Sequence, residues 1–170
     1  METIRKAKLT EVTEVKRLLD QGAQDGALLA RPLMELYEFA RDFFVYADGE
    51  GLGGCGALHI DMADLAEVRS LMVRPDLRGR GIGLGLLRAC VDDARHLGIP
   101  RIYTLTRIPE FFAKRGFVEV AKHALPHKVY NDCVRCPLFP DCDEVPMTYD
   151  LNCTEDDTTT ENMEGPRQWH

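Results

Sequence analysis

A segment rich in arginine and glycine carries the clearest chemical meaning in this sequence. Residues Leu71 to Gly83 read Leu-Met-Val-Arg-Pro-Asp-Leu-Arg-Gly-Arg-Gly-Ile-Gly. Glycines allow backbone N–H groups to approach phosphate oxygens closely, and the N-terminus of a following helix adds the positive end of its dipole. Arg78 and Arg80 can add charge-assisted hydrogen bonds to the same oxygens. A glycine run alone also fits a purely structural turn, so the flanking elements decide whether a diphosphate binds here.

The flanking elements form a strand, a helix and a second strand. Glu67 to Val73 has the composition of a strand, and Pro75 ends it because proline cannot continue a sheet ladder. A helix follows, and Gly98 and Pro100 end it. Arg101 to Thr106 is a short apolar run suited to a strand parallel to the first. The apolar residues that recur on one face of the helix are Ile82, Leu86, Leu87, Cys90, Ala94 and Leu97.

The first half of the chain predicts two helices and a hairpin. Ile4 to Lys8 reads as an edge strand, and Glu11 to Gln21 reads as an amphipathic helix. Pro32 suits the start of a second helix. Phe43 to Ala47 and Gly53 to Ile60 are strand-like runs joined by a glycine-rich turn, which predicts an antiparallel hairpin. We therefore expect a mixed sheet.

Two motifs resemble the signatures of the GNAT acetyltransferase superfamily. Arg78, Gly81 and Gly83 fit Arg/Gln-x-x-Gly-x-Gly/Ala, whose turn holds the pyrophosphate of coenzyme A, and Pro109 to Phe117 resembles the aromatic second signature. The resemblance implies an α/β (α+β) GNAT fold, with a mixed, mostly antiparallel sheet splayed between the fourth and fifth strands and flanked by helices. It also implies acetyl-CoA as co-substrate and no metal in catalysis. The coenzyme contacts that we expect are Leu71, Met72, Val73, Arg78, Gly79, Arg80, Gly81, Ile82, Gly83 and Phe112.

A narrower resemblance covers residues 3–151. Leu28 to Tyr37, Cys55 to His59, Asp64 to Arg69 and Thr104 to Thr106 are similar to the short, single-domain N-acetylglutamate synthases of bacterial arginine biosynthesis. The implied reaction is acetyl transfer from acetyl-CoA to the amino group of L-glutamate. Long forms of that family carry an arginine-binding domain for which this chain has no room, so we expect any feedback regulation to work differently.

Glu67 is the candidate catalytic base, because the resemblance places a catalytic glutamate toward the start of this strand. Its alternative role is that of a solvated strand carboxylate, since position alone does not fix a pKa. Strand periodicity predicts that Glu67, Arg69, Leu71 and Val73 share one face, so that Glu67 and Arg69 line the cleft together.

Glutamate carries two carboxylates, so its site requires cations, and arginine suits bidentate recognition. Arg31 matches a basic substrate-binding position of the family, with a solvated arginine at a helix start as the alternative. Arg69 and Arg135 are the other candidates. Cys136 stands where the longer synthases carry the serine of an Arg-x-Ser element, which weakens the assignment of Arg135, and Lys128 is the fallback.

The general acid is open. Many superfamily members have tyrosine as the second aromatic of the pair, whereas this chain has Phe111 and Phe112. Tyr130 can donate a proton from the substrate-side loop, or it can simply pack with its hydroxyl solvated. The remaining candidates are His59, His127 and Tyr103. A coenzyme A thiolate is also a fairly good leaving group, so a dedicated acid is not essential.

The six cysteines raise the question of a metal. Cys133, Cys136 and Cys142 lie near His127, and a Cys-x-x-Cys step is common in zinc sites. A full site needs four ligands at recognisable spacing, so we predict no metal and treat zinc and a redox pair as alternatives. Cys55 and Cys90 read as small core residues, and Cys153 falls in the tail.

Length and charge bound the remaining possibilities. A chain of 170 residues suits one domain, which we place at residues 1–151, followed by an acidic tail, residues 152–170, expected to be disordered. The net charge of −7 argues against nonspecific binding to nucleic acid. Neither a membrane-spanning run nor a secretory leader is apparent, so we expect a cytoplasmic protein. The sequence leaves open whether it forms a homodimer.

Two rival functions remain at this stage. One is a GNAT enzyme that acetylates another amine, such as a polyamine, an aminoglycoside or a protein N-terminus, although several candidate carboxylate-binding arginines weigh against cationic acceptors. The other is a noncatalytic module that binds acetyl-CoA as a signal, for which loss of the base would be the signature, and Glu67 is present.

Overall fold

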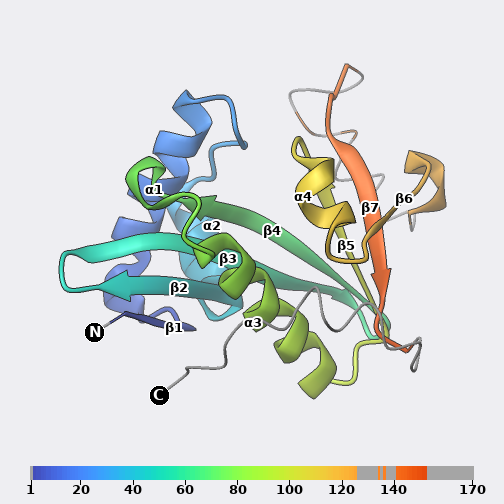
Figure 1. Ribbon diagram of the computed structural model, residues 1–170, viewed down its shortest axis with the longest axis horizontal. Coiled ribbons are helices and arrows are strands. Elements are labelled where there is room, and N and C mark those ends of the chain that lie inside the picture. The colour runs from blue at the N-terminus through green and yellow to red at the C-terminus, as the bar shows by residue number, and fades with distance from the viewer. Residues whose placement is uncertain (1, 126–133, 135, 137–140, 153–170) are drawn as a thin grey trace.

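A single mixed sheet of seven strands organises the computed structural model (Figure 1), which describes residues 2–125, 134, 136 and 141–152. The strand order across the sheet is β1-β2-β3-β4-β5-β7-β6. All neighbouring strands are antiparallel except β4 and β5, which are parallel. The strands are β1 (Thr3–Lys6), β2 (Phe43–Asp48), β3 (Gly51–Met62), β4 (Leu65–Val73), β5 (Arg101–Thr106), β6 (Val118–Glu119) and β7 (Val145–Asp150).

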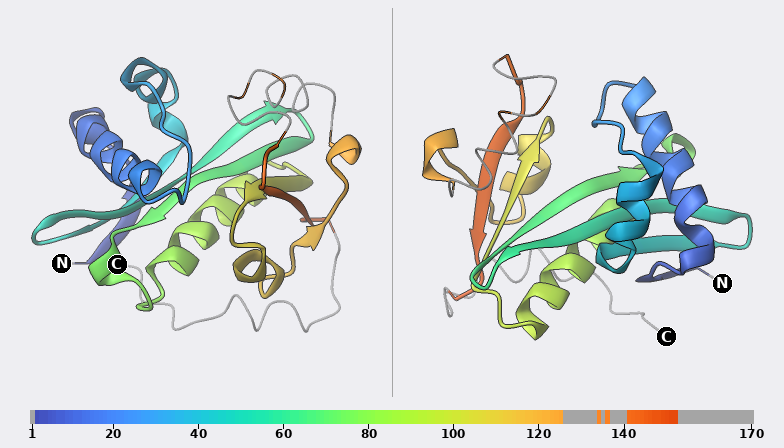
Figure 2. Two further views of the ribbon diagram at one scale, coloured as in Figure 1. Left: turned by 90° about the horizontal axis from the view of Figure 1, so that it is seen from above. Right: turned by 180° about the vertical axis from the view of Figure 1, so that it is seen from behind.

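The four α-helices α1 to α4 within the described ranges cover the two faces of this sheet (Figure 2). Helices α1 and α2 lie on one face, and α3 and α4 lie on the other. Short 3-10 turns complete the connections. The helices are α1 (Val12–Gln24), α2 (Leu33–Glu38), α3 (Ile82–His96) and α4 (Pro109–Ala113). No helix in the described ranges is both long enough and apolar enough to cross a membrane.

Helices α1 and α3 bury most of the apolar stripe that the sequence predicts, but Leu97, predicted as part of the α3 stripe, is 51% exposed. Helix α1 continues through Gly22 and ends three residues beyond the predicted Gln21. Helix α3 ends at His96, close to the predicted Leu97. Burial of these stripes against the sheet stabilises the helices far more than propensity does. The buried residues of the two helices are Val12, Val15, Leu18 and Leu19 of α1 and Ile82, Leu86, Leu87, Cys90, Val91 and Ala94 of α3.

The parallel pair β4 and β5 opens into a splay. Only Ala66 and Glu67 of β4 pair with β5, opposite Ile102 and Tyr103. Beyond these pairs the two strands run apart, as Figure 1 shows on the way from their common start at the lower right. The predicted GNAT architecture, including the splay between the fourth and fifth strands, is therefore confirmed.

A β-bulge in β4 changes which side chains of this strand share one face of the sheet. The pairing of β3 with β4 shifts by one residue between Cys55 and Ala57, and Ser70 has a positive φ of 55°. An extra residue reverses the alternation of side chains. The prediction that Glu67, Arg69, Leu71 and Val73 share one face is therefore wrong. Glu67 and Arg69 lie on the α1–α2 side with Met72, whereas Leu71 and Val73 pack against the core on the α3 side.

The last two strands had no counterpart in the sequence prediction. Strand β7 contains Pro146, which has no N–H for a ladder, and β6 has only two residues. Met147 is nevertheless fully buried in the α3-side core. Residues 153–170 lie outside the described residues, so the boundary between domain and tail stays a prediction.

Candidate active site

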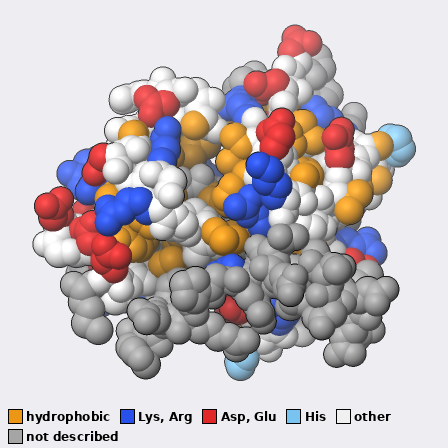
Figure 3. Space-filling model, in the orientation of Figure 1, with side chains coloured by type: hydrophobic (Ala, Val, Ile, Leu, Met, Phe, Trp, Pro, Cys, Tyr) orange, Lys and Arg blue, Asp and Glu red, His pale blue; other side chains and the backbone are white. Residues whose placement is uncertain are grey.

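A cleft of about 1240 Å³ opens where β4 and β5 diverge. One end is lined by Arg78, Gly79 and Gly81 of the glycine-rich turn, and the other by Arg31 and Glu67. Strand β4 supplies one wall from Glu67 to Val73. Figure 3, in the orientation of Figure 1, shows apolar side chains beside Lys and Arg side chains over the middle of the face that is turned toward the viewer. A long ligand with an anionic end would fit such a cleft.

The glycine-rich turn has the backbone geometry that its sequence predicts. Gly79 and Gly81 have φ values of 79° and 80°, in the left-handed region that side chains disfavour. Gly81 is also the N-cap of α3, so the helix N-terminus begins at the turn. Arg78 lines the cleft, and its Nε donates to the Val73 carbonyl at 3.1 Å, which leaves its terminal nitrogens for a ligand. The turn can therefore hold a diphosphate.

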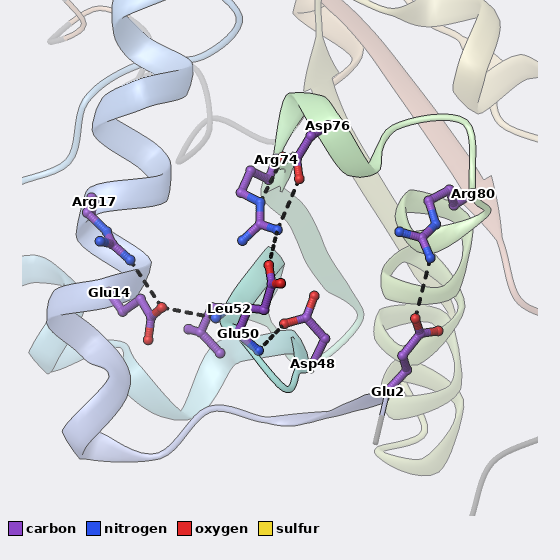
Figure 4. A network of polar contacts seen from close by, with 9 residues as sticks. All are labelled: Glu2, Glu14, Arg17, Asp48, Glu50, Leu52, Arg74, Asp76 and Arg80. Atoms are coloured by element: carbon purple, nitrogen blue, oxygen red, sulfur yellow. Dashed lines mark hydrogen bonds and ion pairs between the residues drawn. The ribbon is translucent and has the colours of Figure 1, made fainter.

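Two arginines near this turn are engaged by carboxylates, as Figure 4 shows. Arg74 makes two hydrogen bonds to Asp76, at 2.8 and 3.0 Å, and an ion pair with Glu50 at 3.8 Å. Arg80 reaches Glu2 at 3.5 Å, and in the described part of the chain it is absent from the cleft lining. Of the two arginines predicted to bind phosphate, only Arg78 is brought to the cleft.

The aromatic motif forms part of the cleft floor. Phe112 is 2% exposed and packs edge-to-face on Phe111 and Phe117, with ring centroids 5.1 and 5.2 Å away. Arg115 lies 4.3 Å over the Phe111 ring. Phe111 and the predicted coenzyme contact Phe112 line the cleft, together with the predicted contacts Leu71, Met72, Val73, Ile82 and Gly83.

Glu67 lies in the cleft wall, at the last position where β4 pairs with β5 before the two strands diverge. Its side chain is 15% exposed, and burial raises the pKa of its carboxyl, while Arg69 and Arg31 oppose that shift. The Arg69 Nη1 lies 3.6 Å from Glu67 Oε2. A carboxyl with a raised pKa, lining a cleft, has the properties of a general base.

Arg69 and Arg31 bring two guanidinium groups to the same end of the cleft. Arg69 is 12% exposed, and its Nε is buried and finds no hydrogen-bond partner among the described residues. Burial, followed by the nearby Arg31, lowers the pKa of Arg69. Arg31 pairs with Glu35 and donates from Nε to Ser70 Oγ at 3.1 Å. An anionic ligand would relieve the repulsion between the two cations.

His59 and Tyr103 stand on either side of Glu67 in the sheet. His59 of β3 and Tyr103 of β5 are both register partners of Glu67, and all three line the cleft. His59 Nδ1 lies 2.7 Å from Asp42 Oδ2, and the Tyr103 hydroxyl donates to Asp61 at 2.8 Å. Burial and the nearby Glu67 raise the pKa of Tyr103 well above its ordinary range. The phenol therefore stays protonated, with its proton directed at Asp61.

Several predicted residues lie outside the described residues, namely Tyr130, Arg135, Lys128, His127 and Cys133. Their assignments stay predictions. Cys136 and Cys142 line the cleft as free thiols, and within the described ranges no group of three or more His, Cys, Asp or Glu side chains could hold a metal. Cys55 and Cys90 are buried core residues, and burial raises the pKa of each thiol to about 12.

Arg107 is a cleft residue that the sequence analysis missed. It follows β5 directly, donates to the Gly26 carbonyl at 2.9 Å and to Asp143 at 2.8 Å, and so joins the segment after α1 to the segment before β7. Glu144, whose carboxyl pKa is raised by burial, lies beside it in the cleft lining. The available signal was position, since ligands gather at the carboxyl ends of parallel strands.

Comparison with known proteins agrees with this geometry. Residues 14–117 match the acetyltransferase (GNAT) family. The chain is 34% identical to an uncharacterized N-acetyltransferase of Chlorobaculum tepidum, over 87% of this chain and 96% of that protein. It is 35% identical to an amino-acid acetyltransferase of Mycobacterium tuberculosis, over 78% of this chain and 77% of that protein.

A solved structure shares the fold closely. N-acetylglutamate synthase from Neisseria gonorrhoeae, complexed with coenzyme A and N-acetyl-glutamate, superposes with a TM-score of 0.80 at 27% identity. The match covers 89% of this chain and 35% of the synthase chain. The noncatalytic alternative is set aside, because the matching family and the named relatives are acetyltransferases. The chain therefore belongs to the acetyltransferase (GNAT) family and is an acyltransferase, as its sequence predicts.

Proposed function

We propose that the chain transfers the acetyl group of acetyl-CoA to the α-amino group of L-glutamate. The reaction would be the first step of arginine biosynthesis, carried out in the cytoplasm. Members of the GNAT family use acetyl-CoA as the donor, and the cleft offers the coenzyme a glycine-rich turn at one end. The observation that carries the acceptor assignment is at the other end, where Arg69 and Arg31 flank the carboxyl of Glu67.

The charges at this end suit an amino acid that bears carboxylates. Two carboxylates buried in a cleft each need a cation, because desolvation otherwise opposes binding. Arg69 offers a buried nitrogen without a partner among the described residues, and Arg31 stands close enough to lower the pKa of Arg69. A polyamine would meet these two cations unfavourably. The printed name of the Mycobacterium relative and the N-acetyl-glutamate bound to the gonococcal synthase support the same assignment.

The reaction requires few parts. The acceptor enters as an ammonium ion and loses a proton to Glu67, and its nitrogen then attacks the thioester carbonyl. A C–N bond forms, the C–S bond breaks, and the coenzyme leaves as a thiolate that takes up the second proton that the nitrogen gives up. The balance is one N-acetyl product, one free thiol and one proton released to solvent. Holding donor and acceptor in one cleft supplies much of the acceleration.

The test is a steady-state assay of coenzyme A release against a panel of acceptors at matched concentration. The panel contains L-glutamate, L-glutamine, L-alanine, spermine and a short peptide with a free N-terminus. We expect the highest kcat/KM with L-glutamate. Comparable values for L-glutamate and L-glutamine would mean that only the α-carboxylate meets a cation. A preference for spermine or the peptide would overturn the acceptor assignment and leave the GNAT fold untouched.

A further inference from the structure

We propose that His59, held by Asp42, is the proton exit of the active site, which takes from Glu67 the proton that the acceptor gives up. This inference rests on the proposed function in one respect, the use of Glu67 as base. It concerns where the proton goes next, which the acceptor assignment does not decide.

The sheet places the two groups directly opposite each other. His59 on β3 is the register partner of Glu67 on β4, and both side chains line the cleft. Side chains at paired positions of antiparallel strands have Cβ atoms roughly 4.5–5.5 Å apart. His59 is also one of the charges that act on the pKa of the Glu67 carboxyl. Paired side chains at this general separation can exchange a proton directly or through one water molecule.

Asp42 prepares the imidazole for this role. The carboxylate lies 2.7 Å from Nδ1, in the short turn η2 (Ala40–Asp42). When Nδ1–H donates to a carboxylate, Nε2 keeps its lone pair and can accept a proton. The edge-to-face contact with Phe39, at 4.7 Å between centroids, fixes the ring plane. An imidazole that donates from Nδ1 to Asp42 therefore keeps Nε2 as its acceptor and has a defined orientation.

The other groups around Glu67 cannot do this. Arg69 on β4 and Arg31 ahead of α2 carry no acceptor atom. Tyr103 on β5 donates to Asp61 of β3, and its raised pKa keeps it protonated. The Asp61 carboxylate already accepts the hydrogen bond from the Tyr103 hydroxyl. Among these groups around Glu67, His59 is the one that offers a ring nitrogen able to accept a proton.

A neighbouring acceptor lets Glu67 lose its proton and return to its base form within each turnover. The Glu67 side chain is only 15% exposed, and substrates filling the cleft would cover it further. Asp42 is 20% exposed, yet it lies outside the cleft lining as far as the described residues define it. His59 is 16% exposed, so the proton that Nε2 accepts can pass to water. One proton passes from Glu67 to Nε2 and then to water in each turnover.

Chemical rescue tests the inference. We expect His59→Ala to lower kcat by about 100-fold, the lower end for a positioned proton-transfer group, with the KM for acetyl-CoA unchanged. Added imidazole should restore kcat saturably, and more so at a pH at which imidazole is the free base. His96→Ala removes an exposed histidine from the last turn of α3 and is the matched control, with no loss and no response to imidazole.

A second variant keeps the test decisive if His59→Ala folds poorly. Asp42→Asn replaces the carboxylate with an amide that can donate to Nδ1, which moves the ring proton to Nε2 and blocks acceptance there. We expect its kcat to fall while its far-UV circular dichroism stays that of the wild type. Full activity in folded His59→Ala, or a loss that imidazole does not restore, would overturn the inference. The panel assay identifies the best acceptor first and these variants are measured with it, so a failed glutamate assignment and a failed proton exit remain distinguishable.

Discussion

Replacement of Arg69 by methionine should separate acceptor binding from coenzyme binding. Arg69 is 12% exposed and has a buried Nε without a partner among the described residues, so methionine can fill its space but cannot donate. A charge-assisted hydrogen bond contributes about 1.5–3 kcal/mol. Since 1.4 kcal/mol corresponds to a factor of ten, the KM for L-glutamate should rise by about 10- to 150-fold. The KM for acetyl-CoA should not change.

The same substitution should also change the pH profile. Arg69 is the largest of the charges that hold down the pKa of Glu67 against burial. Its removal raises that pKa further, and a base works only when deprotonated. The acidic limb of kcat/KM therefore moves to higher pH in Arg69→Met. Arg69→Lys keeps the charge and is the matched control, with a smaller displacement of the limb.

The assay is coenzyme A release with L-glutamate varied at saturating acetyl-CoA, between pH 5 and 9. Thermal unfolding of each variant checks that the fold survives. An unchanged KM for L-glutamate in a folded Arg69→Met would refute the assignment of Arg69 to the acceptor. A raised KM with an unmoved acidic limb would refute the coupling between Arg69 and the base.

Four further substitutions probe the glycine-rich turn and the acceptor end of the cleft. Gly81→Asp places a carboxylate at a position with positive φ in the turn that we expect to hold the diphosphate of acetyl-CoA. Calorimetry should therefore show a large loss of acetyl-CoA affinity, and an unaltered titration would contradict the turn assignment. Arg78→Ala should weaken acetyl-CoA binding by about 1.5–3 kcal/mol. Arg80→Ala should weaken it less, because the Arg80 side chain reaches Glu2 and does not line the cleft that the described residues form. Equal losses in the two variants would contradict this difference between the two arginines. Arg31→Ala should raise the KM for L-glutamate by about 10- to 100-fold. A change confined to the KM for acetyl-CoA would mean that Arg31 contributes to coenzyme binding and not to acceptor binding.

The sequence predicts those parts of the fold that depend on local pattern. The apolar stripes of α1 and α3, the hairpin of β2 and β3 and the positive-φ glycines of the turn all follow from residue type and spacing. Strand β7 was missed because Pro146 disfavours a strand assignment, while its partners β5 and β6 supply the ladder only in the folded chain.

The site shows the same division. Glu67, Arg69 and Arg78 line the cleft as predicted. The local sequence was sufficient to place the first two on one strand and the third in the glycine-rich turn. The bulge at Ser70 could not be predicted, since nothing in the residue types requires an extra residue there. It moves the side chains of Leu71 and Val73 to the opposite face of the sheet. Contacts between distant segments escape local reasoning as well. Asp42 with His59 and Gly26 with Arg107 are the examples here.

The most direct test of the proposed mechanism is the pH dependence of kcat/KM for L-glutamate in the wild type and in Glu67→Gln. Burial raises the pKa of Glu67, so the wild-type rate should fall on the acidic side at a pH above the ordinary range of a glutamate carboxyl. Glu67→Gln should retain acetyl-CoA affinity, lose about 100-fold or more in turnover and lack that limb. A variant that keeps the wild-type acidic limb, or the wild-type turnover, would contradict the assignment of Glu67 as the base.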